Sequence, residues 1–224
     1  MTELIFMLTH HDITIPNALD VLEQTRDTGL KFIGSKDIGL SDEKLFELFQ
    51  NMRDLGMTTF LEVVSNDEKR HFSGVQKAME IEADYLIGGM PQFAARTLEY
   101  LRSMKANLRF FPYVGKIVGH PCKLEGGIDD IVRQGMELAR MGADGINLLL
   151  YRYSGNVEFL LNGIVKNLKK DLIVAGNVDS FEKVDQLKKS KIWAFTVGGA
   201  ILERRIVPEK TIREQIIAVL NKLL

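Results

Sequence analysis

Cysteine is almost absent from this sequence: its 224 residues include one, Cys122, so no disulfide can form within the chain. A lone thiol suits a reducing compartment, and we interpret Cys122 as a small buried or loop residue. The N-terminal residues MTELIFMLTHHD lack the basic segment of a secretory signal. No apolar run approaches the roughly 20 residues that a transmembrane helix needs. These absences predict a cytoplasmic protein that does not enter the membrane.

An excess of one charge sign is also missing. Lys and Arg total 29, Asp and Glu total 30, and the formal net charge is −1. This balance argues against a nucleic-acid surface as the main partner. No G-x-G-x-x-G fingerprint follows a predicted strand, so the sequence gives no sign of a dinucleotide. We expect no cofactor.

What the sequence does contain is a regular alternation of two patterns. Short apolar runs rich in β-branched or aromatic residues alternate eight times with longer amphipathic stretches. The predicted strands span residues 4–9, 31–36, 58–65, 85–88, 109–114, 145–150, 172–175 and 194–197. The predicted helices span residues 16–28, 41–55, 67–81, 92–104, 128–141, 157–168, 181–190 and 211–224.

This alternation indicates the class of fold. Strands that alternate strictly with helices form a parallel sheet with the helices outside. Eight equal units favour closure of the sheet, because a closed sheet has no edge strand. A (β/α)8 barrel needs roughly 200 to 250 residues, which matches this chain. We therefore predict an α/β protein with a single TIM barrel, a closed parallel eight-stranded sheet, over residues 1–224.

Glycines gather at the ends of the last two predicted strands. Gly176 and Asn177 follow one strand, and Gly198 and Gly199 follow the next. In this fold these two loops often form a phosphate pocket, and glycine lets backbone N–H groups approach an anion closely. We assign phosphate binding to these four residues. The alternative is that the glycines only form tight turns.

The segment 174–201 that holds these loops resembles the ribulose-phosphate-binding barrel superfamily, whose pattern is A-G-G/N-(I/V) after one strand and V-G-(S/T/G)-A after the next. The resemblance implies phosphate binding by both loops and the chemistry of an epimerase, isomerase, decarboxylase or synthase. The stretches SKDIGL, FLEVVS, VGHPCKLEGG and VAGNVDS also resemble a family of bacterial barrels, some of which are labelled 4-hydroxythreonine-4-phosphate dehydrogenase. The missing dinucleotide fingerprint argues against a dehydrogenase.

Two charged residues lie in apolar strands, where a charge is costly unless it is paired or functional. Lys36 ends the second predicted strand and Glu62 lies in the third, so we expect them side by side at the barrel mouth. A lysine beside a carboxylate can serve as a catalytic acid/base pair for enolisation. One alternative is a structural ion pair. Another is a Schiff base on Lys36, which a neighbouring carboxylate disfavours.

The glycine-rich segment after the fifth strand is predicted to be a long loop that covers the mouth as a lid. It carries His120, a candidate catalytic base, and Lys116, a candidate substrate contact. His10 follows the first strand and is a further substrate-binding candidate. Because adjacent strand residues point in opposite directions, we expect at most one of His10 and His11 to face the pocket.

Asp37, Tyr151 and Arg152 complete the predicted substrate-binding set, because each directly follows a strand. Arg152 could hold a substrate carboxylate with two hydrogen bonds or form a salt bridge at the rim. We expect no metal, since the two histidines and two aspartates of the metal-dependent epimerases in the resembled superfamily have no counterpart here. The D-x-K-x-x-D motif of its decarboxylase branch is also missing from the third strand.

The sequence thus predicts an enzyme that acts on a small phosphorylated sugar or keto acid by proton abstraction next to a carbonyl, as isomerases and epimerases do. The second hypothesis is an aldolase or lyase that uses Lys36 as a Schiff base. The third is a non-catalytic barrel that binds a phosphorylated metabolite. Assembly into a homo-oligomer is left open.

Overall fold

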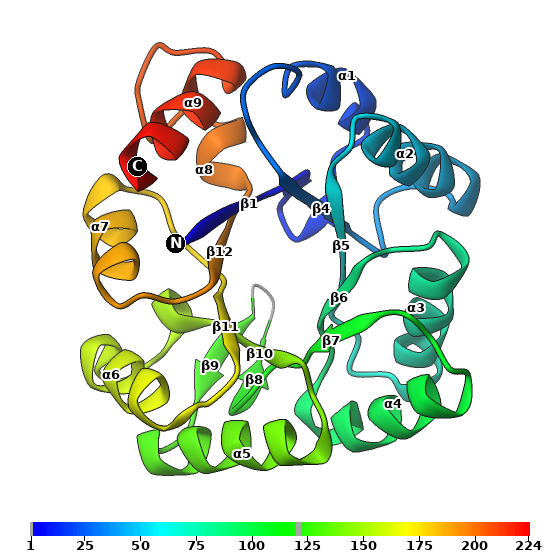
Figure 1. Ribbon diagram of the computed structural model, residues 1–224, viewed down its shortest axis with the longest axis vertical. Coiled ribbons are helices and arrows are strands. Elements are labelled where there is room, and N and C mark those ends of the chain that lie inside the picture. The colour runs from blue at the N-terminus through cyan, green and yellow to red at the C-terminus, as the bar shows by residue number, and fades with distance from the viewer. Residues whose placement is uncertain (1, 120–121) are drawn as a thin grey trace.

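The computed structural model describes residues 2–119 and 122–224, and its centre is an eight-stranded parallel sheet (Figure 1). In sheet order the strands are β10 (Gly145–Leu148), β11 (Asp171–Val174), β12 (Ala194–Val197), β1 (Glu3–Met7), β4 (Phe32–Lys36), β5 (Thr58–Val63), β6 (Tyr85–Gly88) and β7 (Arg109–Phe111). Each lies within a predicted strand or begins one residue before it.

The two ends of that order meet and close the sheet. A parallel bridge pairs Tyr113 with Asn147, and the Asn147 N–H donates to the Pro112 carbonyl at 2.9 Å. Pro112 has no N–H to give to a ladder, and β7 accordingly ends at Phe111. The prediction of a (β/α)8 barrel is confirmed.

Amphipathic helices form a ring outside the strands (Figure 1). They are α1 (Ala18–Glu23), α2 (Asp42–Asp54), α3 (Glu68–Glu80), α4 (Pro91–Ser103), α5 (Ile128–Met141), α6 (Val157–Asn167), α7 (Phe181–Lys189) and α9 (Ile212–Leu223). In several, a side chain caps the first turn by accepting from a backbone N–H, namely Ser41, Asp67, Asn156, Ser180 and Thr211. The helices match their predicted spans closely except α1, which ends early because residues 24–28 form turns.

The barrel interior is packed separately from the layer between sheet and helices. Side chains alternate along each strand, and the inward-pointing set at the start of the strands is apolar and aromatic. Within it the rings of Phe60 and Tyr85 are stacked, with centroids 4.4 Å apart. Further along β4 and β5 the same inward-pointing set continues with Lys36 and Glu62. The inner faces of β4 and β5 therefore begin in an apolar core and end in charged residues.

The structure adds two hairpins that the sequence does not predict. β2 (Thr9–His10) and β3 (Ile13–Thr14) follow β1, and β8 (Lys116–Val118) and β9 (Lys123–Glu125) follow β7. The second hairpin occupies the segment predicted to be a long loop. Part of that segment is regular, because the backbone groups of β8 and β9 pair with each other. His120, the predicted catalytic base of this segment, lies outside the described residues.

Two short helices follow other strand ends. The 3₁₀ helix η1 (Leu150–Arg152) comes after β10, and α8 (Gly199–Leu202) comes after β12. Both lie at the mouth of the barrel. The sequence predicted the end of a strand at the start of η1 and a loop at the start of α8. They therefore set the direction of the side chains that follow these two strands.

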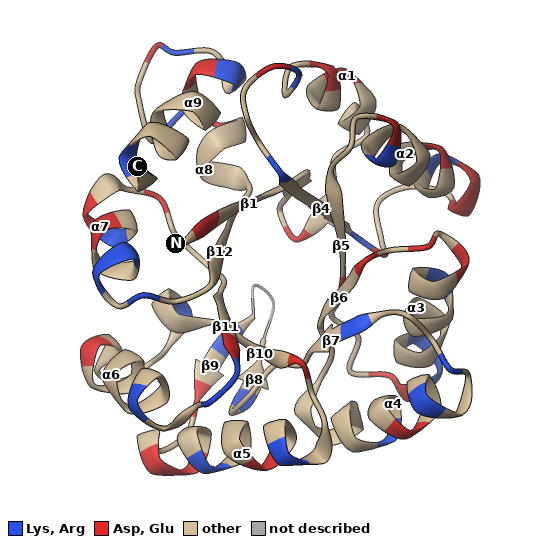
Figure 2. Ribbon diagram, viewed as in Figure 1, with Lys and Arg blue, Asp and Glu red and all other residues tan. Residues whose placement is uncertain are grey.

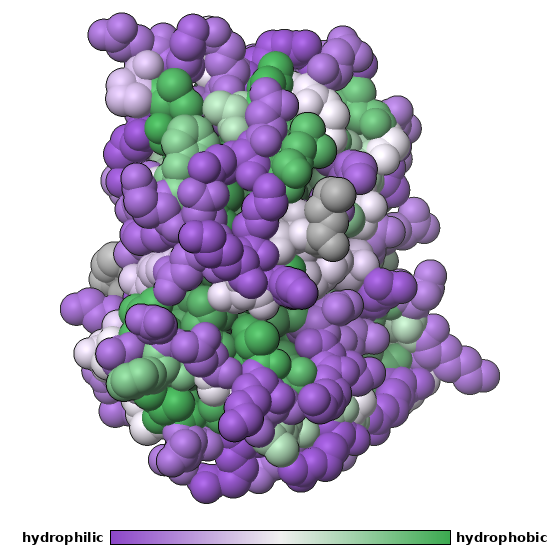
Figure 3. All heavy atoms as spheres, turned by 60° about the vertical axis from the view of Figure 1, so that its left-hand side comes forward, coloured by the Kyte–Doolittle hydropathy of each residue, from purple (hydrophilic) through white to green (hydrophobic). Residues whose placement is uncertain are grey.

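The outer surface is polar for the most part. Charged residues lie mainly on the ring of helices and its loops (Figure 2). Figure 3 shows hydrophobic residues in both halves of the side that it brings forward, with the broadest group in the lower half. On α6, Phe159 is 65% exposed and Val165 40%. Among the described residues, no helix combines the length and the apolar character needed to cross a bilayer.

Candidate active site

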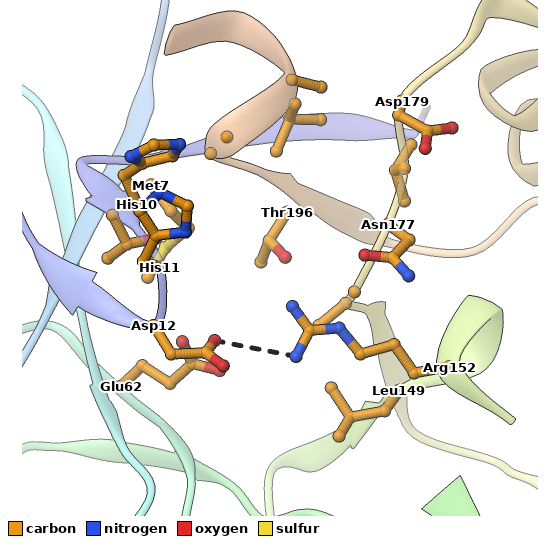
Figure 4. Close-up of a pocket in the computed structure, with 18 of the residues that line it drawn as sticks. Met7, His10, His11, Asp12, Glu62, Leu149, Arg152, Asn177, Asp179 and Thr196 are labelled. Atoms are coloured by element: carbon orange, nitrogen blue, oxygen red, sulfur yellow. Dashed lines mark ion pairs between the residues drawn. The ribbon is translucent and has the colours of Figure 1, made fainter. Parts of the chain in front are cut away.

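A cavity of about 440 Å³ lies at the carboxyl ends of the strands. Its walls come from the ends of β1, β4, β5 and β12, from the segments that follow β1, β10, β11 and β12, and from Cys122 between β8 and β9. Figure 4 shows His10 and His11 on one side of this space and Asn177 on the other. Below them, Asp12 and Arg152 extend toward one another. Catalytic residues of (β/α)8 barrels occupy this end of the fold.

Lys36 and Glu62 stand opposite each other in the register of β4 and β5. Lys36 Nζ is 3.5 Å from Glu62 Oε2, and the two side chains are 6% and 10% exposed. The structure thus brings together the two residues predicted to share acid/base work. Their burial means that each ion depends on protein partners rather than on water.

Asp12 is the third member of this cluster; as a residue that follows the first strand it was expected near the barrel mouth, but no specific role was predicted for it. It lies in the turn between β2 and β3 with a φ of 62°, and its Oδ1 accepts from Lys36 Nζ at 3.0 Å. The same hairpin is tied to β4 by Thr14, whose hydroxyl donates to the Lys36 carbonyl at 2.8 Å and accepts from the Lys36 N–H at 2.9 Å. The hairpin that supplies the carboxylate therefore also anchors the lysine backbone.

The charge of Lys36 follows from these neighbours. Burial lowers the pKa of Lys36, but the carboxylates of Glu62 and Asp12 outweigh this effect, and the pKa lies above its ordinary value. Lys36 is therefore an ammonium cation at neutral pH, which can donate a proton or stabilise an oxyanion. A Schiff base needs the neutral amine, so the resting site favours acid/base chemistry.

Tyr113 holds Glu62 from the other side. Its side chain is buried, and its hydroxyl donates to Glu62 Oε1. Burial raises the pKa of Tyr113 well above its ordinary value, so the hydroxyl stays protonated. At Gly88, where φ is +79°, an added Cβ would lie 3.2 Å from the Tyr113 ring and 3.3 Å from Glu62 Cγ. The glycine leaves room for the pair, and each carboxylate oxygen of Glu62 has its own partner.

Arg152 reaches the cluster from η1. Its Nη1 lies 3.6 Å from Asp12 Oδ1 and donates to the carbonyl of Cys122 at 3.4 Å. Its side chain crosses Gly176, where an added Cβ would lie 2.9 Å from Arg152 Cγ. The thiol of Cys122 lines the same cavity, and burial raises its pKa. Because Gly176 has no side chain, the Arg152 side chain can pack across it and reach Asp12.

All four residues predicted to bind phosphate line this one cavity. The loops that carry them are neighbours, because β11 and β12 pair in parallel. Gly198 has no room for a side chain, since an added Cβ would lie 2.8 Å from the Thr9 carbonyl oxygen. Among the described residues, no turn or loop hydrogen bond uses the N–H of Gly176, Asn177 or Gly199. The loops after β11 and β12 therefore offer backbone N–H donors that their own turns leave unused.

The outer end of the cavity carries a second set of charges. His10 Nε2 lies 2.6 Å from Glu203 Oε1, and Arg205 Nε lies 2.5 Å from Glu203 Oε2. Asp179 pairs with Lys183 at 2.7 Å. These side chains are 30% to 52% exposed, far more open than the Lys36 cluster. An anion that binds at this end must compete with Glu203 for His10 and Arg205.

Three predicted substrate contacts do not line the cavity. Asp37 lies against α3, where an added Cβ at Gly74 would be 2.8 Å from its Oδ2, and burial raises the pKa of Asp37 to about 6. It follows Lys36 directly, so alternation turns it away from the mouth. Tyr151 faces α7 and donates to the side chain of Gln186 at 2.9 Å. Lys116 is exposed on β8. The structure gives these three no contact with the cavity.

Both His10 and His11 line the cavity, and their ring centroids are 3.8 Å apart. The expectation that at most one of them faces the pocket was wrong. His11 has a φ of 49° in a tight turn, so the alternation of an extended strand does not apply to it. Within residues 2–119 and 122–224, no three His, Cys, Asp or Glu side chains are placed to hold a metal ion.

Comparison by sequence finds no matching family model and no matching curated protein. Comparison by structure finds many barrels that cover nearly the whole chain. Orotidine 5'-phosphate decarboxylase from Pyrococcus horikoshii OT3 aligns with a TM-score of 0.68 and 13% identity, covering 98% of each chain. Phosphoribosylanthranilate isomerase from Thermotoga maritima aligns with a TM-score of 0.67 and 14% identity, covering 100% of this chain and 98% of its own.

A third similar structure is N-acetylmannosamine-6-phosphate 2-epimerase from Clostridium perfringens, with a TM-score of 0.63 and 13% identity over 99% of this chain and 93% of its own. The structures found give no support to the 4-hydroxythreonine-4-phosphate dehydrogenase label. Identities this low carry no residue-by-residue equivalence. What the likeness to these enzymes shows is that this chain shares their (β/α)8 barrel fold.

Proposed function

We propose that this protein is an enzyme that removes a proton next to the carbonyl of a small phosphorylated sugar or keto acid, giving isomerisation or epimerisation. One observation carries the proposal: the buried Lys36–Glu62 pair and the four rim residues 176, 177, 198 and 199 line the same cavity. This arrangement supports the proposal, because one small substrate could contact both the proposed acid/base pair and the backbone donors.

In the proposed reaction Glu62 is the general base. Its carboxylate takes the proton from the carbon next to the carbonyl, and the C–H electron pair moves into a carbon–carbon double bond. The ammonium group of Lys36 donates to the carbonyl oxygen as negative charge develops there. For the isomer, the proton returns to the former carbonyl carbon, while the hydroxyl on the first carbon gives its proton back to Lys36 and becomes the new carbonyl. For the epimer, the proton returns to the other face of the first carbon, and the former carbonyl oxygen gives its proton back to Lys36. A positioned base of this kind contributes roughly 10²- to 10⁴-fold to the rate.

The raised pKa of Lys36 supports this role over a Schiff base, because the lysine is protonated in the resting site. Among similar structures, the epimerase and the isomerase are named for phosphorylated substrates, which supports the same class of reaction. The proposal is tested by incubating the protein in D₂O with D-ribulose 5-phosphate or dihydroxyacetone phosphate and following the carbon-bound protons by NMR. Exchange above the buffer rate supports it. Absence of exchange with every sugar phosphate and phosphorylated keto acid tried would favour a non-catalytic binding barrel.

Replacing Gly199 with alanine should weaken phosphate binding without unfolding the barrel. An added Cβ would lie 3.7 Å from His10, 3.9 Å from Glu203 and 4.0 Å from Arg205, which are ordinary contacts. The methyl group would occupy space between these three side chains, where the phosphate is proposed to bind. We expect the Kd for inorganic phosphate to rise at least about 10-fold, measured by calorimetry.

Gly135→Ala is the matched control for that variant. Gly135 also lies in a helix, and an added Cβ there would be 3.7 Å from its nearest neighbour, Ile164, on the far side of the sheet from the cavity. Its phosphate affinity should equal that of the wild type. If Gly199→Ala binds phosphate as well as Gly135→Ala does, the phosphate does not bind at this rim.

Replacing Glu203 with glutamine should have the opposite effect. The carboxylate now holds His10 and Arg205 and repels an incoming dianion. Loss of its charge removes this repulsion and weakens the contacts to both donors, and we expect phosphate affinity to rise about 10-fold, or about 1.4 kcal/mol, with a steeper dependence on salt. Glu80→Gln, an exposed change on α3, should leave the affinity unaltered. A weaker affinity in Glu203→Gln would mean that Glu203 orients Arg205 for the ligand.

A further inference from the structure

A second cavity lies at the other end of the barrel from the candidate active site. Its volume is about 600 Å³, and α6, α7 and α9, which are neighbours in the ring of helices (Figure 1), all contribute to it. Thr2, Asp171 and Trp193 line it, and these residues lie at or just before the starts of β1, β11 and β12. It shares no lining residue with the cavity at the carboxyl ends of the strands. We call it the Trp193 cavity.

The Trp193 cavity carries an excess of positive charge. The charged residues that line it are three lysines, 170, 188 and 191, and one aspartate, Asp171, which leaves a formal charge of +2. Within the part of the chain that the structure describes, Lys170 and Lys191 have no ion pair, and Lys188 donates to the carbonyl of Lys222 at 3.2 Å. Figure 2 shows the basic residues of α7 and of the segment before β11 on one side of the molecule. Because cations without partners repel one another, an anion in this cavity would be stabilised.

This positive charge is not a general property of the amino ends of the strands. A cavity of about 790 Å³ lies at the same end of the barrel, between α3 and α4. The charged residues that line it are Glu80, Glu82 and Asp84, and no described lysine or arginine is among its lining residues. Two cavities on one face of the barrel therefore have opposite charge, so a uniformly basic surface does not explain the lysines of the Trp193 cavity.

The indole of Trp193 is held in place beside these lysines. Its centroid lies 5.2 Å from the Phe111 ring and 5.3 Å from the Tyr85 ring, both in the apolar core at the start of the strands. The side chain is nevertheless partly exposed and lines the cavity. Among residues 2–119 and 122–224, no group accepts a hydrogen bond from the indole N–H. A ring already fixed by packing gives a planar ligand a surface to stack on with little loss of conformational freedom.

We propose that the Trp193 cavity binds a nucleoside monophosphate, with the base against Trp193 and the phosphate among the three lysines. A phosphate monoester carries about two negative charges at pH 7, which matches the formal charge of the lining residues. Lysine binds phosphate as a point charge, whereas recognition of a carboxylate by two hydrogen bonds favours arginine. A volume of about 600 Å³ is within the range of small-molecule sites. This second site does not rest on the proposed function.

Tryptophan fluorescence tests the proposal directly, because Trp193 is the only tryptophan in the sequence. The protein is titrated at fixed ionic strength with adenosine 5'-monophosphate (AMP), adenosine or inorganic phosphate, with excitation at the red edge, where the base does not absorb. AMP should change the emission of Trp193 and bind at least about 10-fold more tightly than adenosine or phosphate, with the same Kd by calorimetry. Unchanged emission with AMP, or adenosine or phosphate binding as tightly as AMP, would overturn the proposal.

A double variant tests the role of the lysines. Lys170→Gln with Lys191→Gln should raise the Kd for AMP at least about 10-fold and make binding less sensitive to salt, while the affinity for adenosine stays the same. Thermal unfolding checks that the variant is folded. The matched control is Lys44→Gln with Lys69→Gln, the same charge change at exposed residues of α2 and α3, and it should bind AMP as the wild type does. Equal AMP affinity in the two double variants would contradict the proposal.

Gly199→Ala separates this site from the candidate active site. Gly199 lines the cavity at the carboxyl ends of the strands and does not line the Trp193 cavity. The AMP titration should therefore be unchanged in this variant. A loss of AMP affinity in Gly199→Ala would place the nucleotide in the other cavity and overturn the proposal, whereas the effect of Gly199→Ala on inorganic phosphate bears on the proposed function alone.

Discussion

Glu62→Gln is expected to lower the rate of proton exchange into sugar phosphates by about 10³-fold, within the range of a positioned general base. The amide keeps the shape of the side chain and can still accept from the Tyr113 hydroxyl at the Oε1 position. It cannot take a proton from carbon. We therefore expect kcat to fall with little change in KM, measured by solvent-deuterium exchange under saturating ligand.

The control for this variant is Glu68→Gln on α3, which removes a surface carboxylate paired with Arg96. It should exchange protons at the wild-type rate. Thermal unfolding of both variants shows whether each remains folded under assay conditions. A positioned general base contributes at least about 100-fold to the rate. If Glu62→Gln retains more than about a tenth of the wild-type rate, the loss is too small for a general base, and another group is the base. Asp12 is then the next candidate, because it also lies against Lys36.

Lys36→Met is expected to reduce the free energy of unfolding by about 3 to 5 kcal/mol at pH 7, the usual result of breaking a buried ion pair by removing one partner. The ammonium group lies between two carboxylates: its Nζ is 3.0 Å from Asp12 Oδ1 and 3.5 Å from Glu62 Oε2. Without it, two partly buried carboxylates face each other with no lysine between them. Chemical denaturation monitored by circular dichroism measures the loss.

The pH dependence of the same variant has a definite sign. The folded-state pKa of Lys36 is raised above its ordinary value. Its contribution to stability is therefore complete below the unfolded pKa of about 10.4 and is lost as pH rises through the higher folded value. The difference between wild type and Lys36→Met should stay constant from pH 7 to about 10 and shrink above that.

Lys210→Met provides the comparison. Lys210 pairs with Glu214 at 3.2 Å, and the two side chains are 53% and 44% exposed, so water replaces the lost partner. We expect this change to cost no more than about 1 kcal/mol. A Lys36→Met variant as stable as Lys210→Met would show that the buried cluster does not depend on the lysine for its stability.

The regular elements could be predicted because each one satisfies a local rule. Helices such as α5, Ile128–Met141, bury one face and keep the other polar, and α5 ends at Gly142 in the left-handed conformation. Strands such as β6, Tyr85–Gly88, are short apolar runs between helices. The four glycine-loop residues could be placed for a related reason, since consecutive strands of a closed parallel sheet end side by side.

The hairpins could not be predicted in the same way. β2–β3 and β8–β9 have two or three residues per strand, too few for a period of two to be visible. Their positions matter, because the turn of the first hairpin carries Asp12 into the cavity and places His10 and His11 on the same side. Glu203 was missed for a similar reason, as it follows α8, a four-residue helix with no recognisable periodicity.

The sequence by itself determined the order of strands and helices, the closed barrel and the meeting of Lys36 with Glu62. These follow from hydrophobic periodicity and from the fixed alternation of side chains, which act over a few residues. Only the tertiary structure decided that Asp37 and Tyr151 turn outward, that Tyr113 reaches Glu62 and that Asp12 and Arg152 complete the cluster. Those outcomes depend on turn conformation and on contacts between residues distant in the chain, which no local pattern records.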